Sequence, residues 1–202
     1  KLRSVKDLGD KTTYEWFVSN PINNYNVSVQ IGNYVAVQDT FVKNSEIHFM
    51  NHYVLDYNQE LASNFFPQSK EVIRFYEKYF GDYQWYEDGY KLVEVPYLGM
   101  EHQSAVTYGN GFSMYNGIRS KSWPMYGVID PLIIHETGHE WFGNSVTASD
   151  PTHIWIHEGL QVYSESIYFE DKFDSYEVGV HYLNTIKNRI AKVITKYKKV
   201  QI

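Results

Sequence analysis

The sequence contains no cysteine among its 202 residues. This absence excludes disulfide bonds and thiolate ligands, so a zinc site here must be built from histidines and carboxylates. No window approaches 18 apolar residues, and we therefore expect no membrane-spanning helix. A block of lysines and arginines is also missing, and the formal net charge of −6 argues against a nucleic-acid partner.

The chain starts with Lys-Leu-Arg-Ser, without an initiator methionine or the apolar core of a signal peptide. We therefore expect an internal piece of a longer protein, and the sequence leaves the compartment open. What is abundant is aromatic: 19 Tyr, 11 Phe and 5 Trp. Such side chains suit a groove that grips peptides, although an aromatic core alone explains the composition better.

The first fifty-odd residues have the pattern of β-strands. Apolar residues alternate with polar ones over 27–31 and 35–37, and the turn signal Gly32-Asn33 between them predicts a hairpin. A further strand is indicated over 47–55. We expect residues 1–57 to be the C-terminal part of an N-terminal β-sandwich-like domain.

The pattern changes after about residue 58. A helix is predicted from Ser69, as its N-cap, through Phe80, with Gly81 as its C-terminal stop. Short strands are indicated over 90–95 and 104–108.

From Trp123 onward the pattern is helical apart from one loop. Predicted helices cover Pro131–Phe142, with the proline in the first turn, and Thr152–Phe169. A last amphipathic helix is marked by Leu183, Ile186, Ile190, Val193 and Tyr197. The fold class is therefore α+β.

One segment of the second helical region carries metal-site chemistry: His135-Glu136-x-x-His139. Residues four apart on a helix lie above one another, so two imidazoles can bind one Zn²⁺ while the glutamate reaches its water. This pattern arises by chance in roughly 2% of such sequences. The alternative is a pair of core histidines that are helical neighbours.

Zinc also needs a third protein ligand and an open position. Glu158 follows His139 after eighteen intervening residues, on the next predicted helix and beyond a loop that lets the chain reverse. Requiring a glutamate at this spacing lowers the chance expectation more than tenfold. Glu165 lies two helical turns after Glu158, so it is our candidate to orient His135, with a solvated helix face as the equal alternative.

Two other histidine pairs have the same spacing. His153 and His157 lack a glutamate in the general-base position, and we interpret them as outer or surface residues. His48 and His52 lie in a predicted strand, where residues four apart are too far from each other to chelate.

The complete spacing, His135-Glu136-x-x-His139 and then Glu158, resembles the gluzincin zinc aminopeptidase family, of the membrane alanyl aminopeptidase and leukotriene hydrolase type. A second segment, Gly99-Met100-Glu101-His102, is similar to that family's Gly-x-Met-Glu-Asn exopeptidase strand.

The resemblance implies a thermolysin-like catalytic domain over 58–202, incomplete at its C-terminal end, with one Zn²⁺. It implies that Glu136 is general base and then general acid, and that Glu101 binds the free α-amine of a peptide substrate. Gly99, Met100 and His102 would line the same substrate strand. A desolvated ammonium needs such a carboxylate, although a lone strand-end glutamate would be read as structural.

The sequence departs from the family in two places. His102 stands where the family has asparagine, which puts the way the peptide is held in doubt. The family also has an oxyanion-stabilising tyrosine roughly sixty residues beyond the zinc glutamate, farther than this chain extends, and we expect neither Tyr182 nor Tyr197 to replace it. Full activity of this piece alone is therefore not expected. The alternatives are a related endopeptidase or epoxide hydrolase, and a catalytically lapsed peptide-binding module.

Overall fold

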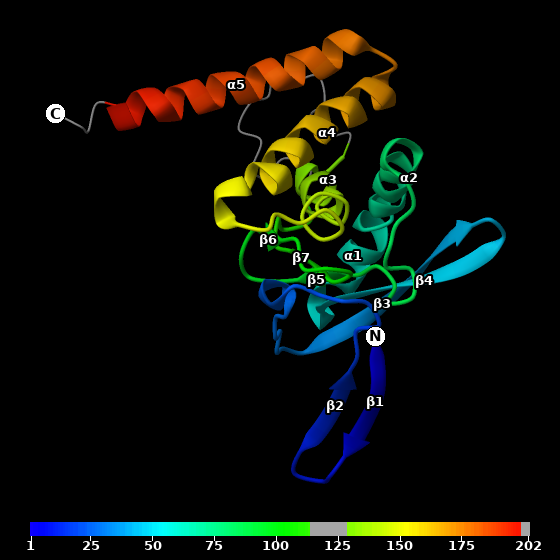
Figure 1. Cartoon of the computed structure of the whole chain (residues 1–202). Helices are drawn as coiled ribbons and strands as arrows, with labels where there is room; N and C mark the ends of the chain where they lie inside the picture. Colours follow the sequence, from blue (N-terminus) through cyan, green and yellow to red (C-terminus); the bar gives the residue numbers. More distant parts are fainter. Residues whose placement is uncertain (114–128, 199–202) are drawn as a thin grey trace.

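The computed structural model describes residues 1–113 and 129–198, and it has the predicted α+β architecture (Figure 1). The part of the predicted helical pattern that covers 123–128 lies outside the described residues. The strands are β1 (Leu2–Asp7), β2 (Thr12–Trp16), β3 (Tyr34–Lys43), β4 (Glu46–Leu55), β5 (Leu92–Glu94), β6 (Gly99–Met100) and β7 (Val106–Tyr108). The α-helices are α1 (Gln59–Phe65), α2 (Gln68–Phe80), α3 (Pro131–Gly138), α4 (Trp155–Phe173) and α5 (Tyr176–Lys198).

Five strands form the main sheet, in the order β3-β4-β5-β7-β6. The β4–β5 and β5–β7 pairs are parallel, whereas β3–β4 and β6–β7 are antiparallel. Strands β1 and β2 form a separate antiparallel hairpin that projects away from the sheet (Figure 1). Because the main sheet joins β4 to β5, it crosses the expected domain boundary after residue 57, and the two-domain division stays a prediction.

The predicted hairpin over 27–37 is wrong. The side chains of Val27, Val29 and Ile31 are 67–92% exposed and belong to no strand, so their alternation faces no core. The hairpin instead joins β3 to β4, and it turns at Asn44 and Ser45, which both have positive φ. Two-residue hairpin turns require this conformation because it matches the strand twist.

Helix α2 packs on the sheet side that holds the core, and its bounds agree with the prediction to within one residue. The predicted cap is wrong, since Ser69 lies inside the first turn and donates its hydroxyl hydrogen to Phe66 O at 2.7 Å. Gly81 ends the helix with φ +91°, a conformation that side chains disfavour. The core that α2 covers is strongly aromatic, including Phe66, Phe75, Tyr76, Tyr90, Tyr108 and Trp141.

Helix α3 lies between the sheet and α4, and α5 packs on α4 as the outermost layer (Figure 1). Helix α3 begins at Pro131 as predicted but ends at Gly138, four residues early, because the backbone tightens. Glu140 N–H bonds to Thr137 O, and Trp141 N–H to Gly138 O, each three residues back. Helix α4 is displaced from its predicted range, beginning after a 3₁₀ turn (Pro151–His153) and continuing to Phe173.

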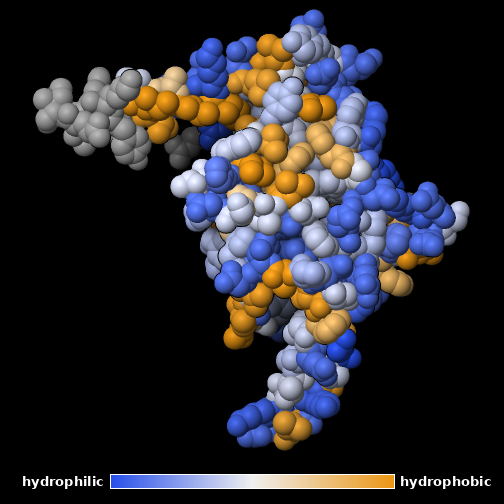
Figure 2. All heavy atoms as spheres, in the orientation of Figure 1, coloured by the Kyte–Doolittle hydropathy of each residue, from blue (hydrophilic) through white to orange (hydrophobic). Residues whose placement is uncertain are grey.

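Apolar side chains of α5, among them Ile190, Val193 and Ile194, are exposed along the part of the helix that extends past the body (Figure 2). Within the described part of the chain, none of the helices is both long and apolar enough to cross a membrane.

Candidate metal centre

The start of α3 is fixed by a buried carboxylate. Asp130 caps the helix by accepting the Leu132 N–H at 2.8 Å, and it also accepts the Tyr108 hydroxyl at 2.7 Å and the Asn110 amide at 3.0 Å. Burial raises the pKa of Asp130, which these donors oppose. Since Tyr108 belongs to β7, Asp130 sets the position of α3 relative to the sheet.

One turn along α3, the two histidines bring their outer ring nitrogens together. His135 Nε2 and His139 Nε2 lie 3.3 Å apart. Glu158 comes from the first turn of α4, and its Oε2 lies 3.6 Å from the His135 nitrogen and 3.8 Å from that of His139. His139 keeps helical φ and ψ beyond the end of α3, which is why the four-residue spacing still aligns both rings.

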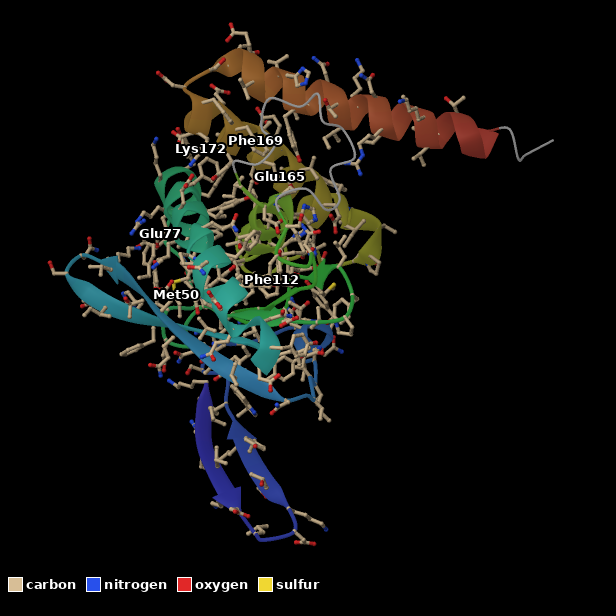
Figure 3. The ribbon with its side chains drawn as sticks, turned by 180° about the vertical axis from the view of Figure 1, so that it is seen from behind. Met50, Glu77, Phe112, Glu165, Phe169 and Lys172 are labelled. Atoms are coloured by element: carbon tan, nitrogen blue, oxygen red, sulfur yellow. The ribbon has the colours of Figure 1, made fainter. Side chains whose placement is uncertain are left out.

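The inner ring nitrogens are already occupied. His139 Nδ1 lies 2.8 Å from Phe142 O, and His135 Nδ1 lies 2.6 Å from Glu165 Oε1. A carbonyl or carboxylate oxygen accepts the Nδ1 proton, so in the neutral rings both Nε2 atoms present lone pairs to the same point. Burial lowers the pKa of His135, but the hydrogen bond and charge of Glu165 outweigh it and raise this pKa to about 9, so a metal that binds here displaces a proton from that ring. Figure 3 shows Glu165 on the stretch of α4 that faces α3.

Three lone-pair donors that converge in this way repel one another unless a proton or a metal cation lies between them. Ligands about 2.0–2.1 Å from a tetrahedral Zn²⁺ are separated by about 3.3–3.5 Å. The two histidine nitrogens, 3.3 Å apart, match that geometry, and the Glu158 oxygen lies slightly farther out, at 3.6 and 3.8 Å from them. The donor set, two imidazoles and a carboxylate, therefore fits one zinc ion.

Glu136 lies on the same helix and is buried against the edge of the sheet. Burial raises the pKa of its carboxyl to about 8. A side chain added at Gly99 would begin 3.1 Å from Glu136 Oε1, so the absence of one lets β6 lie directly against this carboxylate. Ligand atoms of Glu136, His139 and Glu101 all lie within 4.8 Å of one another.

Glu101 follows β6 directly and is buried beside Glu136. The Tyr25 hydroxyl donates to Glu101 Oε1 at 3.4 Å. His102 is also buried, and its Nδ1 makes no hydrogen bond with the described residues. Met100 ends β6, so the four residues 99–102 lie together at the sheet edge, and their role in binding substrate stays a prediction.

Four residues at this site were missed by the sequence analysis: Tyr25, Asn26, Glu140 and Asn144. Asn26 donates its amide to Asn144 Oδ1 at 2.8 Å across 118 residues of sequence. No local pattern could have indicated that contact. Glu140 was detectable, since it follows His139 and a charged residue in so apolar a helical segment requires a partner.

The rival histidines lie elsewhere. His157 Nε2 accepts the Ala148 N–H at 2.9 Å, which ties α4 to the preceding loop, and His153 is exposed. His52 is fully buried in β4, where its Nδ1 accepts the Leu92 N–H at 2.9 Å.

The sequence is similar to those of known aminopeptidases. A probable aminopeptidase 1 of Sulfurisphaera tokodaii is 23% identical over 183 residues, which are 89% of this chain and 22% of that protein. Human endoplasmic reticulum aminopeptidase 2 is 32% identical over 124 residues, 55% of this chain and 12% of that protein. This chain thus spans less than a quarter of either relative.

The fold is similar to that of a two-domain M1 zinc metallopeptidase, a mutant crystallised with L-tryptophan. The TM-score is 0.74 at 15% identity, and the match covers 95% of this chain and 40% of that one. The model of the peptidase family M1 domain matches residues 65–200, most of the chain, which confirms the resemblance to zinc aminopeptidases. The chain belongs to peptidase family M1.

Proposed function

We propose that this chain forms the active-site region of a zinc aminopeptidase, which hydrolyses the first peptide bond of a substrate with a free N-terminus. The observation that carries the proposal is the convergence of His135 Nε2, His139 Nε2 and Glu158 Oε2 within 3.3–3.8 Å, with both histidine Nδ1 atoms engaged. These three residues would hold one Zn²⁺. When bound, the ion supplies Lewis acidity that lowers the pKa of a coordinated water toward about 7 and polarises the scissile carbonyl.

Glu136 is the proposed general base and then general acid. Its carboxylate would take the proton of the attacking water and pass it to the leaving amine. Burial, which raises its pKa to about 8, gives it a proton affinity suited to that transfer. A nearby cation lowers this pKa again, so the carboxylate is ionised when the site is loaded.

Glu101 is the proposed anchor for the substrate's α-ammonium group. It is buried, so a cation that enters beside it loses water and needs a paired charge. An anchor within 4.8 Å of the His139 and Glu136 ligand atoms leaves no length for a residue ahead of the scissile bond. This proximity favours an exopeptidase over an endopeptidase.

Residues Gly99, Met100 and His102 are proposed to bind the substrate backbone. In the described part of the chain β6 pairs on one side only, with β7, so its other edge can add an extended peptide as a further strand. Glu165 is proposed to fix the ring and tautomer of His135 through the 2.6 Å contact.

The test combines metal analysis with a substrate panel. We expect one zinc per chain, loss of zinc in Glu158→Ala, and retained zinc without turnover in Glu136→Gln. Hydrolysis of aminoacyl chromogenic amides is expected to exceed that of their N-acetylated forms by at least about tenfold, since acetylation removes the ammonium charge. Equal rates on free and blocked substrates would contradict the aminopeptidase assignment, and zinc binding unaffected by Glu158→Ala would contradict the metal site.

A further inference from the structure

Glu140 is a buried carboxylate for which the proposed reaction has no use. It follows His139 directly and is only 1% exposed. Its Oε1 accepts the Ser104 N–H at 2.7 Å, and its Oε2 accepts the Asn144 side-chain amide at 3.2 Å. Burying a carboxylate is costly unless its oxygens are bonded, so these contacts indicate what the residue does.

The first contact is with a turn that is otherwise strained. Ser104 has φ +58°, a left-handed conformation that costs a residue with a side chain roughly 1–2 kcal/mol. Its N–H donates to Glu140, while its C=O accepts a hydrogen bond from Lys91 Nζ at 3.2 Å. Lys91 is also buried. Two buried side chains, one acidic and one basic, therefore hold the two peptide groups of one residue.

This turn carries the residues that would bind the substrate. It leads from β6 through Glu101 and His102 into β7, and it is closed by a 2.9 Å bond from Ala105 N–H to His102 O. Asn144 adds a second point of attachment, since its amide also donates to the Glu101 C=O at 3.0 Å. Asn144 is in turn held by the Asn26 amide, so its orientation is set from both sides.

Glu140 and Asn144 thus grip the main chain at Glu101 and again three residues later at Ser104. Both residues lie on the segment that directly follows α3 and contains His139. The same short piece of chain therefore holds a candidate metal ligand and the backbone of the candidate amine anchor. A shift of His139 relative to the backbone of Glu101 would require breaking these buried hydrogen bonds.

We propose that Glu140, acting with Asn144, is a positioning residue that fixes the Glu101 carboxylate at the distance from the metal ligands at which a free α-amine is selected. This inference rests on the proposed function, because it assigns a purpose to the amine-binding role of Glu101. A purely structural role would make Glu140 matter for stability alone.

The experiment measures binding, so it does not depend on turnover. Leucine amide and N-acetyl-leucine amide are titrated into the zinc-loaded chain by calorimetry, with zinc content and thermal unfolding recorded for each variant. The variants are Glu140→Gln and Asn144→Ala, with Glu101→Gln as the reference for loss of the amine anchor. In Glu140→Gln one amide oxygen can still accept from Ser104, but the amide nitrogen would then face the Asn144 donor, so one contact is lost.

The matched control is Glu77→Gln. Glu77 also accepts a backbone N–H, that of Tyr83 at 3.0 Å, and the ammonium group of Lys43, a partly buried lysine, at 2.6 Å. Glu77 lies on α2 (Figure 3), and its side-chain hydrogen bonds in the described part of the chain involve none of the residues 101–105. We expect this control to lower the unfolding temperature and to leave both affinities unchanged. Glu140→Gln and Asn144→Ala should weaken leucine amide binding by about tenfold, with the acetylated amide and the zinc content unchanged.

The outcomes separate the two proposals. A free-amine preference that disappears in Glu101→Gln but is intact in both Glu140→Gln and Asn144→Ala overturns the positioning role and leaves the proposed function standing. No free-amine preference in the unaltered chain overturns both. If Glu140→Gln does not fold, the binding result for Asn144→Ala tests the positioning role alone. This substitution removes only the hydrogen bonds of one side-chain amide, to Glu101 O, Glu140 and Asn26.

Discussion

Replacing Gly138 by alanine tests how closely the helix with the metal ligands must approach its neighbours. Gly138 is the last residue of α3 and directly precedes His139. A Cβ added here would lie 2.1 Å from both Tyr76 Oη and Gln161 Oε1, and 2.4 Å from Tyr76 Cζ. Both side chains are 0% exposed, so neither can turn out into solvent.

The cost can be worked from these contacts. Ordinary contact begins at 3.4 Å, so the helix and its neighbours must separate by about 1.3 Å. Overpacking of a tight interior costs about 1–3 kcal/mol. Moving the Tyr76 hydroxyl also weakens its bonds to Gln161 (3.0 Å) and Ser164 (2.8 Å), and a buried group left unpaired costs about 1–3 kcal/mol. Alanine regains about 1 kcal/mol of helix propensity, which leaves a net loss of about 3 kcal/mol.

Urea unfolding of the metal-free chain measures this loss without the contribution of zinc binding. Gly159→Ala is the matched control, because Gly159 lies within α4 and a Cβ there would meet only Trp155 Cβ, at 3.8 Å. We expect that control to stabilise the chain by about 0.5–1 kcal/mol. A Gly138→Ala variant within 0.5 kcal/mol of the unaltered chain would refute the packing argument.

Three further predictions concern single buried groups. Burial lowers the pKa of His52 to about 4, so the neutral ring contributes stability that is complete above pH 6.5 and is lost as pH falls toward 4, by about 3 kcal/mol. Urea unfolding at pH 7 and 4.5 should show this loss reduced in His52→Asn, whose amide oxygen can accept the Leu92 N–H; an equal loss in both chains would contradict it. Asp130→Ala removes the cap of α3 and the acceptor of the Tyr108 hydroxyl hydrogen, so we expect a destabilisation of about 2–4 kcal/mol in urea unfolding, and a loss below about 1 kcal/mol would argue against that role. Glu165→Ala should weaken zinc binding by about 10–100-fold in competition with a chelator at an unchanged fold, whereas unchanged affinity would remove Glu165 from the metal site.

Local patterns predicted the elements whose signals are local. The period of α2 and the proline in the first turn of α3 were enough to place both helices, because each element's apolar face and its start are encoded in adjacent residues. The end of α3 was missed because it depends on the tightened backbone beyond Gly138, which the helical period does not reveal. The alternation over 27–31 failed for a related reason: a period of two indicates a strand only if one face is buried.

The candidate site likewise contains residues that local patterns predicted and residues that they missed. His135, Glu136 and His139 follow from helical spacing, and the structure brings Glu158 and Glu101 to them, as the longer spacings suggested. Tyr25 and Asn26 could not be found, because they reach the site from a 3₁₀ turn far away in the sequence. Contacts of this kind are decided by the tertiary fold, and they leave no periodic pattern in a single sequence.

The close approach of the elements near Glu101 depends on two positions that lack a side chain, Gly99 and Gly138. Gly99 lets β6 approach both Glu136 Oε1 and Thr107 O to within 3.0–3.1 Å of where a Cβ would be. The missing side chain at Gly138 likewise lets α3 lie close to Tyr76 of α2 and Gln161 of α4. A truncated side chain in the aromatic core leaves space into which its neighbours can repack, whereas an atom added at either glycine pushes the packed elements apart. For that reason we expect substitutions at these glycines to change the distance between the metal ligands and Glu101 before they unfold the chain, and substitutions in the surrounding aromatic core to do the reverse.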